Sequence, residues 1–241
     1  MHLSAPIYRL KRQARLLARH ERIPLHHALD RVAAGEGFSS WSLLAAKSSE
    51  AGPEKSLFER LSPGDLLLVA ARPGQGKTLL SLGLAIEAIR SGRRSAFFSL
   101  EYTEVDILSR FEALGVDPVR HADSFTFDRS DDISGDYMIE KLSTEPRGTL
   151  VVIDYLQLLD QRRDKPPVAE QLGRLKSHAK LTGHVLVFIS QIDRRYDPGA
   201  KSVPDVDDLR MPNAFDVSLF DMFCFLHAGT VHVHQARGQP A

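Results

Sequence analysis

The sequence has one cysteine, no net charge and no long apolar run, and each of these absences excludes a class of protein. A lone Cys224, set in an apolar stretch, cannot form a disulfide framework, which favours a reducing compartment and a buried thiol. No segment reaches the roughly 18 apolar residues of a membrane span, and Arg9, Lys11 and Arg12 interrupt the region where a signal peptide would be apolar. We therefore predict a cytoplasmic protein with no membrane partner.

The balanced net charge hides an uneven distribution along the chain. Residues 1–47 hold eight Lys or Arg against three Asp or Glu, whereas residues 101–145 hold four basic residues against twelve acidic ones. Global charge therefore points to no partner, and any contact with nucleic acid should be local and sensitive to salt.

The N-terminal part of the chain is predicted to be a small, basic helical module over residues 1–47. Apolar residues at helical spacing begin at Ile7, and an arginine stripe of Arg12, Arg15, Arg19 and Arg22 falls on the opposite face. Further helices are expected over 25–34 and 41–44. The stripe fits either a solvated face or a surface for DNA phosphates. The polar, breaker-rich residues 48–56 are typical of a linker, which leaves 57–241 as the main domain.

From residue 57 onward, apolar strands alternate with helices. Strands are expected at 66–71, 95–100, 124–127, 149–154, 185–190, 220–226 and 230–234, and helices at 77–91, 103–114, 132–144 and 168–182. Several strands are continuously apolar, as in parallel sheets covered on both faces. The pattern predicts an α/β fold with a doubly wound, mostly parallel sheet, preceded by the small all-α module.

A phosphate-binding loop is predicted where the first of these strands meets the first of these helices. The apolar run 66–71 leads into a glycine-containing loop, and Gly76-Lys77-Thr78 opens the helix. Loop N–H groups and the helix dipole would bind a triphosphate, Lys77 would reach its β- and γ-phosphates, and Thr78 would ligate Mg²⁺. Ala71 departs from the usual pattern, which has glycine there. The nucleotide-binding candidates are Arg72, Pro73, Gly74, Gln75, Gly76, Lys77, Thr78 and Leu79.

Three further strands end in polar residues that suit ATP hydrolysis. Asp154 could hold a Mg²⁺-bound water, or it could simply begin a turn; downstream of a phosphate loop we favour the metal role. Glu101 could act as general base, or it could be a solvated acid at a helix start. Gln191 could sense the γ-phosphate through its amide.

These strands and loops resemble those of replicative DnaB-type helicases. The resemblance covers the loop 69–78, the strand 97–101, the run Val152-Ile153-Asp154-Tyr155-Leu156-Gln157-Leu158, the segment 189–194 and Asp208-Leu209-Arg210, in the family's order. That family also tolerates alanine at the position of Ala71. The resemblance implies a RecA-like P-loop NTPase fold over roughly residues 57–240, with ATP and Mg²⁺ as cofactors and a possible homo-hexamer.

The sequence departs from the family's pattern at three places. Residues 211–216 replace the usual small and acidic residues, which puts DNA contacts from that loop in doubt. Gln235-Ala236-Arg237 lacks the lysine of the family's Lys-x-Arg pair, so Arg237 is either an arginine finger acting in trans or a solvated residue. The family's large N-terminal domain and linker helix are also replaced by the basic module.

The leading interpretation is a Mg²⁺-dependent ATPase coupled to translocation on single-stranded DNA or to unwinding. Its catalytic residues would be Lys77, Glu101, Gln191 and Arg237, and Thr78 and Asp154 would bind the metal. The DNA-binding candidates are Arg194, Arg195, Lys201 and Arg210. For residues 194–201 the alternative is an ordinary polar surface loop. A second interpretation is a non-helicase ATPase switch whose protein partner binds residues 1–47. A P-loop small-molecule kinase ranks third.

Overall fold

The computed structural model describes residues 3–5, 7–50, 52–114, 116–117, 119–154, 156, 159, 165–210 and 216–236. Within this part of the chain, no helix is both long enough and apolar enough to cross a membrane. The cytoplasmic location stays a prediction.

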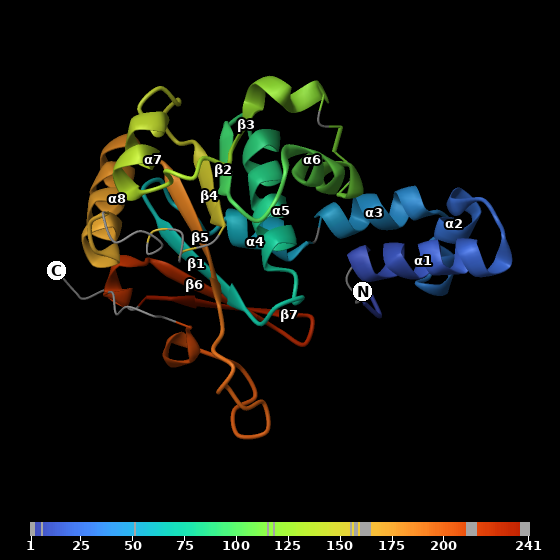
Figure 1. The fold of residues 1–241 in the computed structure, drawn as a ribbon. Helices are drawn as coiled ribbons and strands as arrows, with labels where there is room; N and C mark the ends of the chain where they lie inside the picture. Colours follow the sequence, from blue (N-terminus) through green and yellow to red (C-terminus); the bar gives the residue numbers. More distant parts are fainter. Residues whose placement is uncertain are drawn as a thin grey trace.

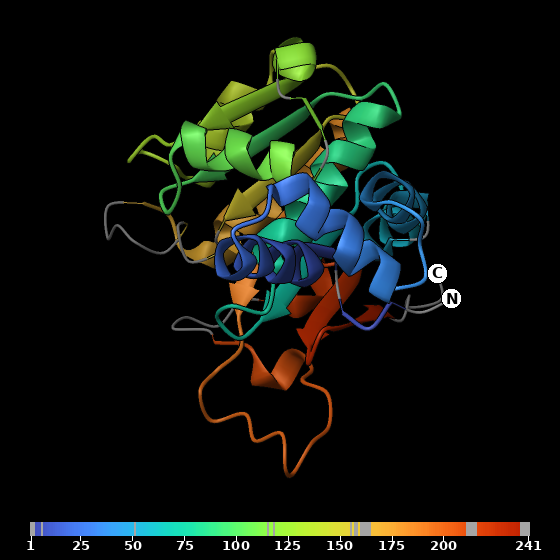
Figure 2. The same ribbon diagram turned by 90° about the vertical axis from the view of Figure 1, so that its right-hand side faces the viewer.

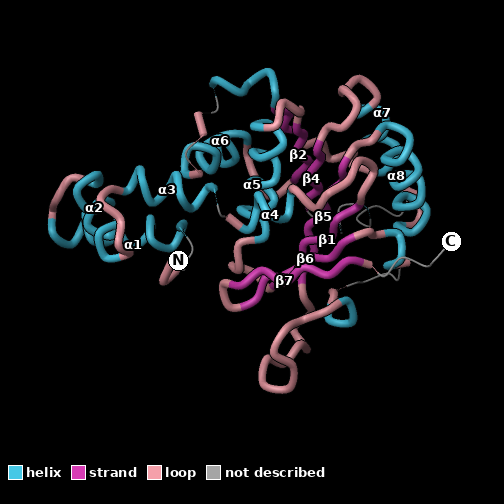
Figure 3. Tube along the Cα trace, turned by 180° about the vertical axis from the view of Figure 1, so that it is seen from behind, coloured by secondary structure: helices cyan, strands magenta, loops and turns pink. Residues whose placement is uncertain are grey.

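A seven-stranded sheet forms the centre of the molecule (Figures 1 and 3). Its strands are β1 (Leu66–Ala71), β2 (Ser95–Ser99), β3 (Phe125–Asp128), β4 (Leu150–Asp154), β5 (Val185–Gln191), β6 (Met222–His227) and β7 (Thr230–Gln235). They are ordered β3-β2-β4-β5-β1-β6-β7, and every neighbouring pair is parallel except β6 and β7. The predicted doubly wound, mostly parallel α/β fold is confirmed.

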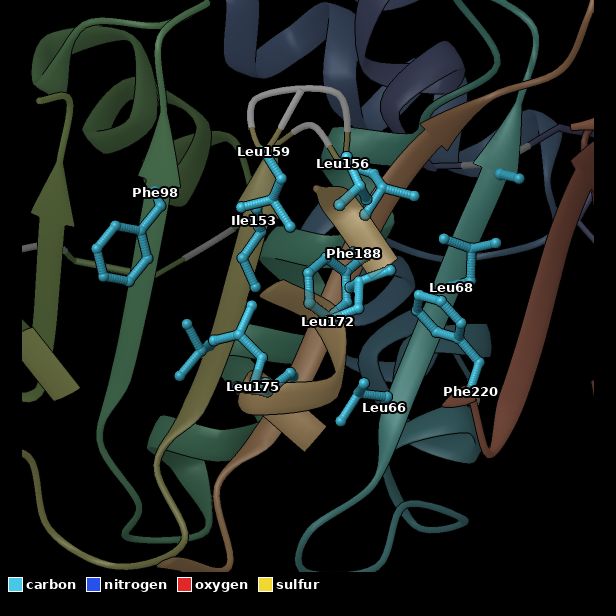
Figure 4. Packing of buried hydrophobic residues seen from close by; sticks show 14 of the residues in the cluster. Leu66, Leu68, Phe98, Ile153, Leu156, Leu159, Leu172, Leu175, Phe188 and Phe220 are labelled. Atoms are coloured by element: carbon cyan, nitrogen blue, oxygen red, sulfur yellow. The ribbon is translucent and has the colours of Figure 1, made fainter. Parts of the chain in front are cut away.

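Each face of the sheet carries its own apolar core. Residues of β1 alternate between the two cores: Leu66 and Leu68 pack on one side, Leu67 and Val69 on the other. The first core, seen from close by in Figure 4, is covered by α7 (Gly135–Leu142) and α8 (Val168–Thr182). The second is covered by α5 (Lys77–Arg90) and α6 (Glu104–Ala113). Burial on both faces explains why the strands are apolar throughout.

Two helix ends have defined caps. Thr103 and Asp106 form a capping box at the start of α6, with aspartate in place of the usual glutamate. At the C-terminal end of α8, Gly183 adopts a left-handed conformation with φ of 72° and ends the helix.

The N-terminal helices form a bundle with a separate small core. We call it the α1–α3 bundle: α1 (Ile7–Glu21), α2 (Leu25–Gly35) and α3 (Trp41–Glu50). Leu10, Ala14, Val32 and Leu44 are buried in its centre, and Trp41 packs against them. In Figure 1 the bundle projects from the side of the sheet that carries α4 and α6.

The segment 48–56 differs from the predicted linker. Helix α3 continues to Glu50, and α4 (Pro53–Phe58) begins three residues later. The predicted linker thus contains helical residues, because Pro53 stands at the first turn of a helix, where it is tolerated, and because Leu57 is anchored in the second core. Where one domain ends and the next begins stays a prediction.

A contact between α4 and α5 gives a stability prediction. A Cβ added at Gly83 would overlap the Cγ of Glu54 and lie 3.1 Å from its Cβ. Overpacking costs about 1–3 kcal/mol, whereas alanine gains about 1 kcal/mol over glycine in a helix interior. We therefore expect Gly83→Ala to lower the free energy of unfolding in the native chain. In a Glu54→Ala background, Gly83→Ala should instead raise the free energy of unfolding. Chemical denaturation of the native chain, the two single variants and the double variant measures this reversal.

A second stability prediction concerns two histidines beside the start of β5. The rings of His178 and His184 lie 5.3 Å apart, and the Nε2 of His184 lies 3.1 Å from the carbonyl oxygen of Pro146. Burial lowers the pKa of both rings. The unfolded chain therefore binds protons that the folded chain excludes, so stability present above the unfolded pKa of about 6.5 falls as pH decreases. Thermal melts at pH 7.5 and 5.5 should show a smaller acid destabilisation for His184→Gln than for the native protein.

Candidate nucleotide site

The loop between β1 and α5 has the backbone that a phosphate-binding loop requires. Gly74 and Gly76 have φ of 77° and 93°, the left-handed region that glycine occupies without strain. Gly76 is also the N-cap of α5, so the N–H groups that follow it lack partners within the helix. Ala71, by contrast, is the last residue of β1 and fully buried. An alanine is tolerated there because the position needs no left-handed backbone.

The sheet brings the ends of four strands to one edge. Strand β5 lies between β1 and β4, so Ala71 pairs with Gln191 and Asp154 pairs with Ile189. On the other side of β4, Ser99 pairs with Asp154. Parallel strands place their carboxyl ends together, and ligands bind at that edge in sheets of this kind. The residues predicted after β1, β2, β4 and β5 are therefore neighbours in space.

Thr78 and Asp154 meet directly across this edge. The Thr78 hydroxyl donates to the Asp154 Oδ2 at 3.2 Å, although 76 positions separate the two residues in the chain. Asp154 is 2% exposed, and burial raises its pKa to about 7, with the negative charge of Glu101 adding to the shift. A buried carboxylate beside a second acid and a hydroxyl is a donor set that favours a hard divalent cation. The residues present therefore fit Mg²⁺, which Thr78 and Asp154 would hold together with the nucleotide.

Lys77 is surrounded by the same groups. Burial lowers the pKa of its ammonium, whereas the charges of Asp154 and Glu101 raise it. Glu101 itself lies two residues beyond β2, with its side chain exposed and its N–H donating to the Ser99 Oγ at 3.1 Å. The ammonium of Lys77 and the carboxylates of Asp154 and Glu101 thus interact electrostatically beside the loop.

The structure adds two residues that the sequence analysis did not select. The Tyr102 hydroxyl lies 3.4 Å from the Thr78 Oγ1, and the Arg110 guanidinium lies 4.4 Å from the centre of the Tyr102 ring. The charge of Arg110 also acts on Asp154. Their positions in the sequence could have indicated both residues, because both follow β2 and Arg110 lies on the helix that leaves the carboxyl edge of the sheet.

Arg72 contacts the segment after β5. Its guanidinium donates to the carbonyl oxygens of Arg194, at 3.2 Å, and Tyr196, and it lies 5.5 Å from the centre of the Tyr196 ring. The predicted nucleotide-binding loop and the predicted DNA-facing segment are therefore joined through one side chain.

The four predicted DNA-binding residues have different surroundings. Arg194 has an exposed side chain, and Arg195 contacts the Asp193 carboxylate at 3.1 Å while its own side chain stays 91% exposed. Lys201 instead contacts the carboxylates of Asp205 at 2.5 Å and Asp208 at 2.8 Å. These contacts raise the pKa of Lys201 to about 12.

Arg210 reaches back to the end of β5. Its Nη1 donates to the Gln191 Oε1 at 3.3 Å, and its backbone N–H donates to the Gln191 carbonyl at 2.8 Å. Leu209 forms an antiparallel bridge with Ile192. The glutamine predicted to sense phosphate is therefore in contact with one of the predicted DNA-binding residues.

Several predicted features lie outside the described residues. These are the candidate arginine finger Arg237, the divergent segment 211–215, and Tyr155, Gln157 and Leu158 of the β4 motif. Among the described residues, no cluster of three or more His, Cys, Asp or Glu could bind a metal by itself. A cation at Thr78 and Asp154 would thus need oxygen ligands from the nucleotide and water.

The family model described as "DnaB-like helicase C terminal domain" matches residues 55–118, which contain the phosphate-binding loop and Glu101. The resemblance to DnaB-type helicases is confirmed. Two solved structures share the fold at 18% identity. One is an ATPase domain, with a TM-score of 0.60 over 77% of this chain and 81% of that one. The other is a DnaB-like replicative helicase, solved in work on its interactions with primase, with a TM-score of 0.59 over 90% and 66%.

Curated DnaB relatives resemble this chain over part of their length. The "Replicative DNA helicase DnaB" of Leifsonia xyli subsp. xyli is 28% identical over 69% of this chain and 43% of its own length. A "Probable plasmid replicative DNA helicase" of Chlamydia muridarum is 27% identical over 62% and 40%. The chain thus spans less than half of either relative. Its α/β part resembles DnaB-like helicase domains in sequence and shares the fold of the two solved structures.

Proposed function

We propose that this chain hydrolyses ATP with Mg²⁺ and couples the hydrolysis to movement on single-stranded DNA or to duplex unwinding. The observation that carries the proposal is the contact of Thr78 with Asp154, which sets a buried carboxylate against the first turn of the helix that follows a phosphate-binding loop. Lys77 and Glu101 lie within electrostatic reach of the same carboxylate. Phosphoryl transfer to water needs this combination of groups.

Each residue has a defined part in the proposed reaction. The N–H groups after Gly76 and the Lys77 ammonium bind the phosphates, and Glu101 accepts a proton from the attacking water. Thr78 and Asp154 would hold Mg²⁺, which would supply positive charge for the phosphate oxygens. Arg110, stacked on Tyr102, is a further cation for this charge. If copies of the chain form a ring, Arg237 would complete the site of its neighbour.

Two contacts provide a route from ATP to DNA. Gln191 contacts Arg210, and Arg72 contacts the backbone of Arg194 and Tyr196. A change at the γ-phosphate could thus move the segment that would contact the DNA backbone. We propose the exposed Arg194 and Arg195 as its main phosphate contacts.

Steady-state ATP hydrolysis tests the proposal. It would be measured with Mg²⁺, with and without single-stranded DNA, at low and moderate salt, with Lys77→Ala as the blank. We expect DNA to stimulate turnover and salt to weaken the stimulation. Turnover that is indifferent to DNA would instead favour the ATPase switch with a protein partner. No turnover above the blank would contradict the proposal as a whole.

The acidic neighbours of Lys201 distinguish it from Arg194 as a candidate DNA contact. We expect Arg194→Ala to weaken single-stranded DNA binding more than Lys201→Ala, because two carboxylates already neutralise Lys201. Loss of one phosphate contact should also reduce the slope of log K against log salt by about 0.7. Fluorescence anisotropy with a labelled oligonucleotide measures both quantities. Equal losses for the two variants would argue against this assignment.

A further inference from the structure

Helix α1 carries an exposed row of arginines that the nucleotide site does not use. Arg9, Arg12, Arg15 and Arg19, called here the basic face, are all exposed. At about 100° per residue, Arg12, Arg15 and Arg19 fall within roughly 60° around the helix, and Arg9 lies roughly 60° beyond Arg12. The opposite side of α1 buries Leu10 and Ala14 in the small core. The arginines therefore face away from the bundle.

The three acidic residues that precede residue 50 do not neutralise this face. Glu21 is ion-paired with Arg31, which lies on α2. Asp30 accepts the Trp41 N–H at 2.9 Å, and Glu36 accepts the Ser4 N–H at 2.7 Å. Within the described part of the chain, these three are the only acids before residue 50, and all have structural partners. These three carboxylates are therefore engaged away from the basic face.

A different basic residue of α1, Lys11, is within electrostatic reach of the acidic part of the chain. The charge of Glu112, on α6, acts on Lys11, whose pKa is lowered by burial first and by Arg15 second. Lys11, which is half-buried, is thus placed near α6. Figure 2, in which the bundle lies nearest to the viewer, shows no strand or helix of the α/β part in front of it.

The dimensions of the row match a polyphosphate backbone. Ten residues of helix separate Arg9 from Arg19, which is about 15 Å at 1.5 Å per residue. Measured along the axis of a B-form duplex, the phosphates of one strand are spaced at about 3.4 Å, so a row parallel to that axis spans roughly four of them. Leu16, 58% exposed, lies among the arginines. It offers an apolar contact to sugars or bases beside the phosphate contacts.

We propose that the basic face of α1 binds the phosphodiester backbone of a nucleic acid. This surface is separate from the 194–210 segment and does not depend on ATP hydrolysis. The chemistry is shared by single strands and duplexes, because both present a row of phosphates. The charge complementarity selects nucleic acid over a neutral or basic protein surface.

Anisotropy with the full chain tests the proposal. The Arg12→Gln/Arg19→Gln double variant would be titrated onto labelled single-stranded and duplex DNA from 50 to 200 mM salt. The matched control is Arg90→Gln/Arg174→Gln, which removes two surface arginines that are paired with acids on α5, α7 and α8. We expect roughly a tenfold loss of affinity for the basic-face variant at low salt. For the single strand, its salt slope should also be smaller by about 1.4, since each lost contact contributes about 0.7. Whichever DNA, single-stranded or duplex, shows the larger loss of affinity is the preferred ligand of the basic face.

Three results would overturn the proposal. The first is no DNA binding by the native chain, and the second is equal loss in the basic-face and control variants. The third is binding to phosphatidylserine vesicles, through these arginines, by a chain that does not bind DNA. Circular dichroism establishes that the variants keep their helices, and Arg9→Gln/Arg15→Gln provides a second pair. The Lys77→Ala chain should keep the arginine-dependent binding, so a chain that binds DNA in this way without hydrolysing ATP would contradict the proposed function alone.

Discussion

Replacing Glu101 by glutamine is expected to reduce ATP turnover by about 10²–10⁴-fold, the usual contribution of a general base. The amide keeps the size of the side chain and its place beyond β2, but it cannot accept a proton from water. Because Lys77, Thr78 and the glycine backbone are unchanged, the variant should still bind ATP. Single-turnover hydrolysis and nucleotide binding, measured on the same preparation, separate the two effects.

Glu104→Gln provides the control for this experiment. Glu104 is an exposed glutamate three residues further along, in the first turn of α6. Its substitution changes the net charge equally but leaves the strand-end position intact. Turnover close to native in Glu101→Gln, or an equal loss in both variants, would contradict the assignment of Glu101 as base.

Replacing Lys77 by alanine is expected to weaken ATP binding by roughly 10–100-fold, since hydrogen bonds to charged groups contribute about 1.5–3 kcal/mol. The loss is aggravated by the surroundings, because Asp154 and Glu101 then face the phosphates without the ammonium between them. Calorimetric titration with a non-hydrolysable ATP analogue and Mg²⁺ measures the affinity directly.

A lysine outside the site shows whether the loss is specific. Lys141, on α7, lies over the Tyr137 ring at 5.4 Å and is remote in sequence from the loop. Lys141→Ala removes the same charge and should bind nucleotide as the native chain does. Unchanged affinity in Lys77→Ala would show that these residues do not form a phosphate-binding loop.

The sequence predicted the strands well because each is a continuous apolar run bounded by breakers. The clearest case is β1, whose predicted and observed ends coincide. Helix α4 was missed because six residues give too short a periodic signal, and its stability comes from tertiary packing. The end of α3 was placed too early for a different reason, because the polar residues at 47–50 resemble a loop.

The nucleotide-binding edge was predictable only in part. Polar residues at strand ends indicated Glu101, Asp154 and Gln191, because parallel strands converge at one edge. Contacts that depend on side-chain direction carried no such signal. The stacking of Arg110 on Tyr102 and the contact of Arg210 with Gln191 join residues whose spacing in the sequence fits no motif.

The Arg72 side chain has a thermodynamic consequence. Its guanidinium holds the carbonyls of Arg194 and Tyr196 while its backbone belongs to the phosphate-binding loop. Any ligand of the 194–201 segment that tightens nucleotide binding through this side chain must itself be tightened by nucleotide, and by the same factor. The order of addition therefore does not matter at equilibrium, and one coupling free energy describes both directions. Arg72→Ala should move that factor toward one without removing either binding site.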